Sequence, residues 1–446
     1  MATVLALDVG SSSVRAQCFD ERADPVDGLR QEQYEGGDPD EIVSLVRRAI
    51  AGRDRDVNAV GASCFGHSLV ALDVNGKPLT PVLGWRDTQS AGAAARLRAR
   101  VDPEAVRVRT GAYVHPSLWP TKLAWLAETE PDVFRGAARF VSFGDYLYEQ
   151  LLGVVHPCSL SIASGTGLLD LRAQRWDAEL LEVLSVDESC LPPISDAALD
   201  GWYPAVFDGA CSNLGAGCTG KTRAALNVGT SAALRILYET ERLQPRPGLF
   251  LYRLDERRVV EGGALSDGGN LFAWLNTTLA PSTTPTWGDV GERSPGGHGL
   301  TFLPFLGGER STGWDLDATG AIAGLTFDTT AGDIRQAALE GVALRLAAIA
   351  ELLPEVEEIV ATGHGLLSDR GWIQVMADAL ARPVTASTVE EASLRGAAVA
   401  TLERLGHPPS EGPLGEVFHP REERAEAYRS ARERQQRLYE ELRGND

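Results

Sequence analysis

The sequence has no apolar run long enough to cross a membrane, and it enters a strand pattern by Val4, which leaves no room for a signal peptide. It also lacks an excess of basic residues: 62 Asp and Glu against 42 Lys and Arg give a formal net charge of -20 at pH 7. Nucleic acids and anionic membranes bind basic surfaces, so this balance argues against both as partners. We expect a cytoplasmic protein.

Cysteine is scarce and scattered, with no Cys-x-x-Cys pair and no histidine at zinc-ligand spacing, which predicts free thiols rather than disulfides or a metal site. The Gly-x-x-x-x-Gly-Lys-[Ser/Thr] phosphate loop is also absent. The chain has 446 residues, more than one hydrophobic core usually holds, so two domains are expected. The six cysteines are Cys18, Cys64, Cys158, Cys190, Cys211 and Cys218.

What the sequence does contain is one pattern that occurs twice. Residues 7–13 read Leu-Asp-Val-Gly-Ser-Ser-Ser, and residues 226–232 read Leu-Asn-Val-Gly-Thr-Ser-Ala. Each copy lies between two apolar runs, which predicts a strand, a tight turn and a second strand. Such turns expose backbone N–H groups and short hydroxyls that suit phosphate. Two copies favour a nucleotide held in a cleft between two related domains, and the alternative is two ordinary hairpins.

The rest of the chain alternates between strand and helix patterns, which predicts an α/β fold. Asn75-Gly76 predicts a hairpin turn between strands at 70–74 and 82–85. Residues 276–299 are rich in Thr, Pro, Ser and Gly and predict a surface loop. Further strands are expected at 57–64, 259–263, 358–362 and 383–386, and helices at 42–50, 89–100, 121–127, 145–152, 267–275, 331–352, 369–380, 391–405 and 421–442.

An ordered set of further segments resembles the FGGY carbohydrate kinases over essentially the whole chain. The resemblance implies two actin-like domains of the ribonuclease H type with a central cleft, in which ATP and a sugar meet. We place a sugar-binding domain that carries the catalytic base at 1–221 and a nucleotide-binding domain at 222–446. The segments are Gly66-His67-Ser68, Trp85-Arg86-Asp87, residues 110–123, Asp208-Gly209-Ala210, residues 302–310 and residues 361–378.

Within that family the chain looks most like the gluconate kinases. The stretches that carry this likeness are residues 115–123, 161–168 with Trp176-Asp177, and 208–215. Phosphoryl transfer to a sugar hydroxyl needs a base for the hydroxyl proton, relief of the phosphate charge and in-line positioning.

Asp208 is the expected base, and the family resemblance gives it the same role. The small residues that follow it allow a helix to start close to the substrate, and a helix N-terminus would hold its carboxylate ionised. The alternative is a plain helix N-cap. Asp8 is the expected Mg²⁺ ligand, through water, whereas the second copy of the repeat carries neutral Asn227. The alternative for Asp8 is that it only braces its own turn.

The remaining site residues follow from the family resemblance. Those expected to bind the sugar are His67, Ser68, Trp85 and Asp87; those expected to hold the ATP phosphates are Ser11, Ser12, Ser13, Gly229, Thr230 and Ser231; and those expected to contact adenine are Gly263, Gly363 and Gly365. Lys122 is interpreted as a helix-surface lysine, with a contact to the carboxylate of an acid sugar as the alternative. Glu309-Arg310 is interpreted as a structural ion pair near the hinge rather than as ligands.

Three positions depart from the family pattern. His364 interrupts the glycines of the adenosine motif, Phe207 replaces a small polar residue before the catalytic Asp, and Gln89 stands where Arg is common. The first departure bears on nucleotide choice and the other two on the sugar.

The sequence therefore predicts an ATP- and Mg²⁺-dependent kinase of a sugar or sugar acid, with a gluconate-like substrate favoured. The alternatives are a xylulose, ribulose or other polyol kinase of the same family, a catalytically degenerate sugar or nucleotide sensor, and a hydrolase on the same fold. A homodimer is compatible with this sequence.

Overall fold

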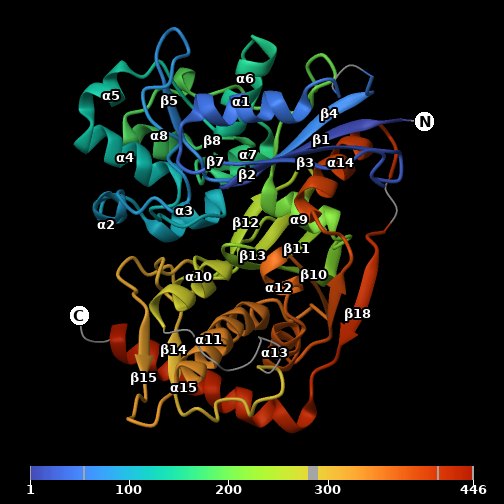
Figure 1. Cartoon of the computed structure of the whole chain (residues 1–446). Helices are drawn as coiled ribbons and strands as arrows, with labels where there is room; N and C mark the ends of the chain where they lie inside the picture. The colour runs from blue at the N-terminus through green and yellow to red at the C-terminus, as the bar shows by residue number, and fades with distance from the viewer. Residues whose placement is uncertain (1, 54–55, 280–289, 409–410, 444–446) are drawn as a thin grey trace.

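The computed structural model describes residues 2–53, 56–279, 290–408 and 411–443. The chain forms two lobes, each built around one β-sheet (Figure 1). Each sheet is covered by helices, so the predicted two-domain α/β architecture is confirmed. Part of the predicted loop 276–299 lies outside the described residues. Among the residues described, no helix combines the length and apolarity needed to span a bilayer.

The first lobe contains a five-stranded sheet in the order β3-β2-β1-β4-β9. Its first strands form an antiparallel hairpin, and β4 and β9 then run parallel to β1. These strands are β1 (Val4–Val9), β2 (Ser13–Phe19), β3 (Arg30–Gln33), β4 (Ala59–Cys64) and β9 (Val206–Phe207), beside two small sheets made of β5 (Val70–Leu72) with β6 (Arg139–Val141) and β7 (Leu169–Asp170) with β8 (Arg175–Trp176).

The helices of the first lobe begin at caps that the sequence supplies. In α1 (Pro39–Ile50), the Asp38 side chain accepts hydrogen bonds from two backbone N–H groups of the first turn, and the apolar face turns inward. The others are α2 (Ala91–Arg98), α3 (Pro103–Thr110), α4 (Trp119–Thr129), α5 (Pro131–Gly136), α6 (Phe143–Leu152), α7 (Leu160–Gly165), α8 (Ala178–Leu184), the 3-10 helix η1 (Glu188–Cys190) and α9 (Asp208–Gly215).

The second lobe repeats this plan in a seven-stranded sheet of order β12-β13-β11-β10-β16-β17-β18. Its strands are β10 (Gly220–Val228), β11 (Ala232–Glu239), β12 (Phe250–Arg253), β13 (Arg258–Leu265), β16 (Glu358–Thr362), β17 (Val384–Ser387) and β18 (Leu414–Phe418), beside the pair β14 (Thr301–Leu303) and β15 (Ala321–Ala323). Its helices are α10 (Gly269–Thr278), α11 (Ala331–Glu351), α12 (His364–Leu367), α13 (Arg370–Leu380), α14 (Ala392–Arg404), the 3-10 helix η3 (Glu422–Arg424) and α15 (Ala425–Arg443).

The two sheets match at the level of register as well as order. In each lobe a hairpin strand pairs antiparallel with the next strand and parallel with a strand that follows later. Asp8 of β1 lies opposite Ser63, and Asn227 of β10 lies opposite Thr362. The Asn227 amide donates to the Thr362 hydroxyl at 3.1 Å. The repeated motif therefore occupies the same place in two copies of one topology.

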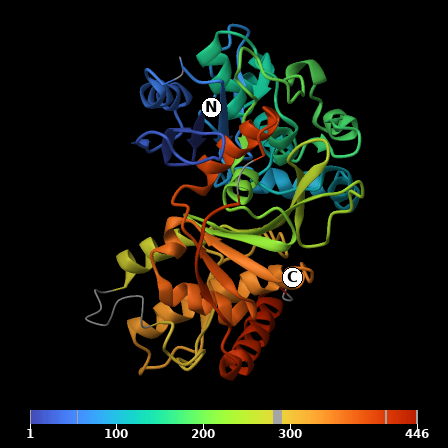
Figure 2. The same cartoon turned by 90° about the vertical axis from the view of Figure 1, so that its right-hand side faces the viewer.

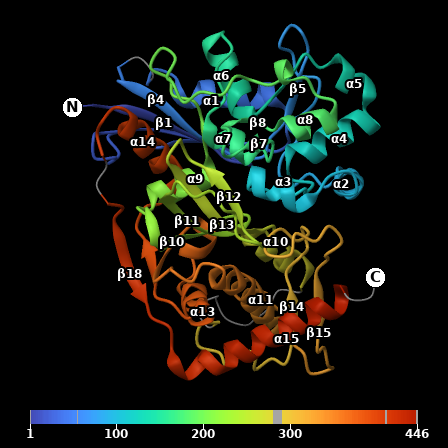
Figure 3. The ribbon, with the colours of Figure 1, turned by 180° about the vertical axis from the view of Figure 1, so that it is seen from behind.

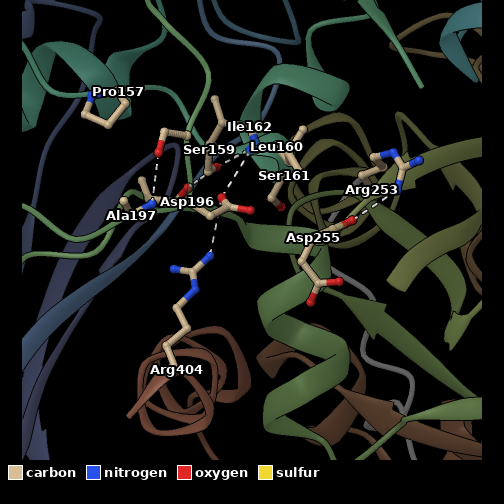
Figure 4. Close-up of polar contacts among 12 residues, drawn as sticks. Pro157, Ser159, Leu160, Ser161, Ile162, Asp196, Ala197, Arg253, Asp255 and Arg404 are labelled. Atoms are coloured by element: carbon tan, nitrogen blue, oxygen red, sulfur yellow. Dashed lines mark hydrogen bonds and ion pairs between the residues drawn. The ribbon is translucent and has the colours of Figure 1, made fainter. Parts of the chain in front are cut away.

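Helix α14 belongs to the second half of the chain but packs on the first lobe. It lies against β1, β4 and α9 (Figure 2). Its crossing with α9 has no room for side chains: a Cβ added to Gly215 would lie 1.8 Å from the Ala392 carbonyl oxygen, and one on Gly396 would lie 1.8 Å from that of Cys211. At its far end, Arg404 pairs with Asp196 at 3.5 Å (Figure 4). The predicted boundary at 221/222 divides the sequence into two halves, but α14 of the second half packs on the first lobe.

A second junction joins the edge of the second sheet to the first lobe. Strand β12 lies against α7 (Figure 3). The Leu251 N–H donates to the Gly111 carbonyl at 2.9 Å, and the Arg253 N–H donates to the Ser164 hydroxyl at 2.9 Å. The two lobes are therefore held together on both sides of the site described below.

Two predictions about secondary structure need correction. Residues 73–79 form the predicted turn, but β5 pairs with β6 rather than with a strand at 82–85, which contributes only a single bridge between Leu69 and Leu83. The helices α3, α5, α7 and α8 were not expected, because each is short and amphipathic periodicity is weak over two turns.

Gly396→Ala should destabilise the protein because its methyl group has no space at the crossing of α9 and α14. We expect the free energy of unfolding to fall by about 1–3 kcal/mol, the range for overpacking, in chemical denaturation. Gly28→Ala is the matched control, since nothing lies within 4 Å of an added Cβ there. Equal stabilities for the two variants would contradict the close helix contact.

Candidate active site

A cavity lies where the two lobes meet, and both lobes contribute to its wall. The first lobe supplies residues from the turn after β4, the loop before α2 and the junction of β9 with α9. The second lobe supplies the turn before β11, the strands β11, β12 and β13, and the loop between β14 and β15. The polar side chains in the wall are His67, Trp85, Asp208, Ser231, Arg235 and Arg310.

Among the described residues that line this wall, Asp208 is the only one with a carboxylate. It is the first residue of α9, and its Oδ1 accepts a hydrogen bond from the Gly209 N–H at 2.8 Å. Phe207 holds the N-cap position, so Asp208 is not a plain N-cap. Burial raises the pKa of Asp208 to about 6, while the nearby Arg235 opposes the rise and Asp8 adds to it. The expected effect of the helix N-terminus is therefore outweighed by burial, although the carboxylate stays mostly ionised at pH 7.

The first turn of the repeat has the exposed tip that a phosphate site requires. Ser11 and Ser12 are exposed, whereas Ser13 is buried at the start of β2. The Gly10 N–H donates to the Ser13 carbonyl at 2.9 Å, and the Tyr34 N–H donates to the Ser12 carbonyl at 3.0 Å. These backbone hydrogen bonds fix the turn and leave the hydroxyls of Ser11 and Ser12 exposed at its tip.

The second turn, Gly229 to Ser231, is held by glycines from two helix starts. The N–H of Gly269, at the start of α10, donates to the Gly229 carbonyl at 2.8 Å. A Cβ on Gly363 or Gly365 would lie 2.6 or 2.8 Å from the Val228 carbonyl oxygen. These close backbone approaches require glycine and keep the turn in a single conformation.

Asp8 lies buried near the end of β1, directly before the first turn, and has one carboxylate oxygen without a partner among the described residues. Its Oδ2 pairs with Arg15 Nη1 at 3.1 Å, and Arg15 Nε continues to Glu391 at 3.1 Å. Its Oδ1 has no hydrogen-bond partner among the described residues. Burial raises the pKa of Asp8, and Arg15 opposes the rise. A lone carboxylate oxygen fits Mg²⁺, which keeps most of its waters, and the described residues contain no cluster of three His, Cys, Asp or Glu side chains for another metal.

His67 is held rigidly in an unusual backbone conformation, with φ at 64°. Its Nδ1 hydrogen-bonds to the Gly165 carbonyl, and Arg310 Nη2 lies 3.1 Å from its Nε2. Burial and the neighbouring Arg310 keep the pKa of His67 well below its ordinary value. The neutral ring therefore donates from Nδ1 and accepts from Arg310 at Nε2.

The other predicted sugar residues divide into two groups. Trp85 lines the cavity, and the guanidinium of Arg310 lies 5.6 Å from its ring centroid. Asp87 accepts hydrogen bonds from the backbone and side-chain nitrogens of Gln89 at 2.9 and 3.0 Å. The Ser68 hydroxyl accepts from the Phe143 N–H at 3.1 Å, which gives it a structural role in capping the neighbouring segment. Neither Asp87 nor Ser68 lines the cavity.

Two interpretations of charged residues were wrong. Glu309 pairs with Arg345 at 2.9 Å rather than with Arg310, and it also accepts from the Tyr439 hydroxyl at 2.6 Å. Lys122 is buried rather than on a helix surface, and its Nζ donates to the His67 and Leu83 carbonyls. Burial lowers the pKa of Lys122 to about 7.

The three glycines expected at adenine lie in different surroundings. Gly363, with φ at 86°, and Gly365 both contact the second phosphate turn. His364 between them is exposed, so its insertion leaves the backbone contact intact. Gly263 instead lies inside β13, where a Cβ would meet Ile349 at 2.7 Å in the core of the second lobe. Packing accounts for that glycine, and its position gives no support to a nucleotide contact.

Arg235 is the cavity residue that sequence reasoning missed. It interrupts the apolar run of β11, and it is only 8% exposed. A lone charge inside a buried strand was the available signal, because such residues rarely lie inside without a partner or a ligand.

The chain thus has two lobes of related topology with a cavity between them, and the comparison with known families identifies this architecture. Residues 3–199 match the N-terminal domain, and residues 224–402 the C-terminal domain, of the FGGY family of carbohydrate kinases. This chain belongs to that family, and its members are phosphotransferases that use ATP.

Individual relatives cover nearly the whole chain. The gluconokinase of Bacillus subtilis (strain 168) is 28% identical, and the match covers 90% of this chain and 88% of the relative. The solved xylulose kinase from Lactobacillus acidophilus matches with a TM-score of 0.89 and 25% identity over 100% of this chain and 99% of that one. The gluconate kinase from Lactobacillus acidophilus matches with a TM-score of 0.88 and 25% identity, over 99% and 98% of the two chains.

The raised pKa of Asp208 predicts a pH-dependent effect of Asp208→Asn on stability. A buried carboxylate whose pKa is raised on folding costs stability above that pKa, and the cost vanishes as the pH falls and the group is protonated. We expect the variant to melt a few degrees above the parent at pH 8, and this difference to shrink toward pH 5, in a thermal melt at both pH values. If the melting temperature of the variant minus that of the parent is smaller at pH 8 than at pH 5, the raised pKa of Asp208 is contradicted.

Proposed function

We propose that this chain transfers the γ-phosphoryl group of ATP to a hydroxyl of a sugar acid, with gluconate as the favoured acceptor. The observation that supports this most is the position of Asp208. It carries the one carboxylate that the described residues place in the wall of the cavity between the lobes, and its pKa of about 6 suits a base at neutral pH.

Asp208 accepts the proton of the acceptor hydroxyl as the phosphoryl group is transferred. Its oxygen is fixed by the Gly209 N–H, and Arg235 and Arg310 favour its ionised form. His67 and Trp85 form a wall of the acceptor side, and Arg310 bridges the two. An aromatic surface beside fixed polar groups is suited to a polyhydroxylated chain.

The two repeated turns hold the ATP phosphates from opposite sides. Ser11 and Ser12 present hydroxyls from the first lobe, and Thr230 and Ser231 do so from the second. Asp8 would hold Mg²⁺ through water, and that ion neutralises phosphate charge when bound. Gly363 and Gly365 place the start of α12 beside the second turn, where the nucleoside rests.

The lobes must separate for the acceptor to enter. The cavity measures about 60 Å³, far below the roughly 300 Å³ at which ligand pockets usually begin. The junctions at α14 and β12 flank it and are the places about which the lobes turn. Closure then removes water from the transferring group, which limits wasteful hydrolysis of ATP.

A sugar acid is preferred over a neutral polyol for two reasons. The Bacillus gluconokinase is 28% identical over 90% of this chain, and the cavity wall contains more cations than carboxylates. Likeness of fold does not separate the substrates, since the xylulose kinase and gluconate kinase structures match almost equally.

Asp208→Asn should abolish phosphorylation without weakening ATP binding. Loss of a general base lowers the turnover number by about 10²–10⁴-fold, whereas the two phosphate turns stay intact. ADP release measures the turnover, and calorimetry measures ATP binding. Asp132→Asn, an exposed carboxylate on α5, is the control and should match the parent. Near-normal turnover by Asp208→Asn would refute the assignment of the base.

A further inference from the structure

The guanidinium of Arg235 is buried in the wall of the acceptor cavity, where Asp208 is the nearby opposite charge but forms no ion pair with it. Among the described residues it makes no hydrogen bond or ion pair, and its Nε is buried with no partner. Burial lowers the pKa of Arg235 to about 10, which leaves it charged at neutral pH. A buried charge without a partner costs free energy, so this position needs a ligand to account for it.

Arg310 adds a second buried guanidinium to the same wall. It is 7% exposed, its Nε also lacks a partner, and its other contacts are with the neutral His67 ring and the face of Trp85. Neither neighbour carries a negative charge. The cavity wall therefore contains two arginines and one carboxylate, Asp208, and the balance is positive.

The direction of β11 indicates which part of a ligand Arg235 meets. Ser231, Ala233 and Arg235 all line the cavity, as alternate residues of one strand must. Arg235 is four residues beyond Ser231, so their Cα atoms lie about 13 Å apart along the strand. The reacting hydroxyl must face the phosphate turn. The Arg235 side chain reaches the start of α9, where a Cβ on Gly209 would lie 2.9 Å from its Nη1, so it lies on the acceptor side of the cavity rather than at the phosphate turn.

We propose that Arg235, assisted by Arg310, binds the carboxylate of the sugar acid and so selects acids over neutral polyols. This inference rests on the proposed function, and it adds a specificity-determining residue to it. A guanidinium donates two parallel hydrogen bonds to a carboxylate, which gives both strength and orientation. Arg310 is already held by His67 and Trp85, so Arg235 makes the larger contribution.

The test compares gluconate with gluconamide, in which a neutral carboxamide replaces the carboxylate at nearly the same shape. Steady-state ADP release is measured with both acceptors for the parent, Arg235→Gln and Arg235→Lys. Arg257→Gln is the matched control, because Arg257 lies exposed in the neighbouring hairpin and pairs with Glu239. Thermal melts of each variant report whether it is folded.

We expect the parent to prefer gluconate by tenfold or more in kcat/KM. Arg235→Gln should raise the KM for gluconate by about tenfold or more and leave gluconamide and ATP little changed, since only the charge-assisted contact is lost. Arg235→Lys should recover part of the preference, and Arg257→Gln should match the parent.

Three results would overturn the inference. Equal losses with both acceptors, or a raised KM for ATP, would mean that Arg235 serves the phosphoryl group instead. No change in Arg235→Gln would remove it from recognition. A parent enzyme that uses gluconamide as well as gluconate would also contradict the proposal, even if Arg235→Gln fails to fold.

Failure of the proposed function is visible separately. If the parent releases no ADP with any acceptor, the kinase proposal fails, and calorimetry of gluconate and gluconamide binding to the parent and Arg235→Gln still decides the role of Arg235. If the parent phosphorylates only neutral polyols, the proposal that the acceptor is a sugar acid fails, and no variant is needed to show it.

Discussion

The backbone contact between α9 and α14 is the constraint on which the site depends. Two glycines, Gly215 and Gly396, allow each helix to touch the other without side chains between them. Asp208 is the first residue of one helix, and Glu391 immediately precedes the other. Glu391 binds Arg15, which binds Asp8. One helix pair therefore positions both Asp208 and, through two ion pairs, Asp8, the carboxylates that we propose for the acceptor and for the phosphates.

Electrostatics in the cavity follow from burial more than from helix direction. The start of α9 favours an ionised Asp208, but removal from water disfavours it more strongly, and the pKa rises to about 6. The same wall buries Arg235 and Arg310, whose Nε atoms have no hydrogen-bond partner among the described residues and which form no ion pair with the nearby Asp208. A protein with a net charge of -20 thus contains a locally positive pocket, built from two side chains rather than from its surface.

Sequence reasoning reached the parts of the fold that local pattern determines. The repeated turn, the α/β layers and the helix start at Asp208 follow from apolar periodicity, one recurrent motif and the small residues after Asp208. The packing of α14 on the first lobe could not be predicted, because it depends on contacts between residues about 180 positions apart, such as Arg395 with Gly215.

The site was also only partly predictable from the sequence, because its contacts join residues that are far apart in the chain. Asp208, His67 and Trp85 line one cavity as expected, whereas the hydroxyl of Ser68 and the carboxylate of Asp87 are used by their neighbours. Glu309 and Arg310 are adjacent in sequence but point to different partners, which no spacing rule reveals.

The central claim is that the two repeated turns and Asp208 together phosphorylate a sugar acid. One coupled assay of ADP release, with Mg²⁺, ATP and gluconate, xylulose, ribulose, glycerol or erythritol, tests it most directly. The account predicts ADP formation that depends on the acceptor and is fastest with gluconate. Folded protein that forms no acceptor-dependent ADP with gluconate, or that forms it faster with any of the neutral compounds, would contradict it.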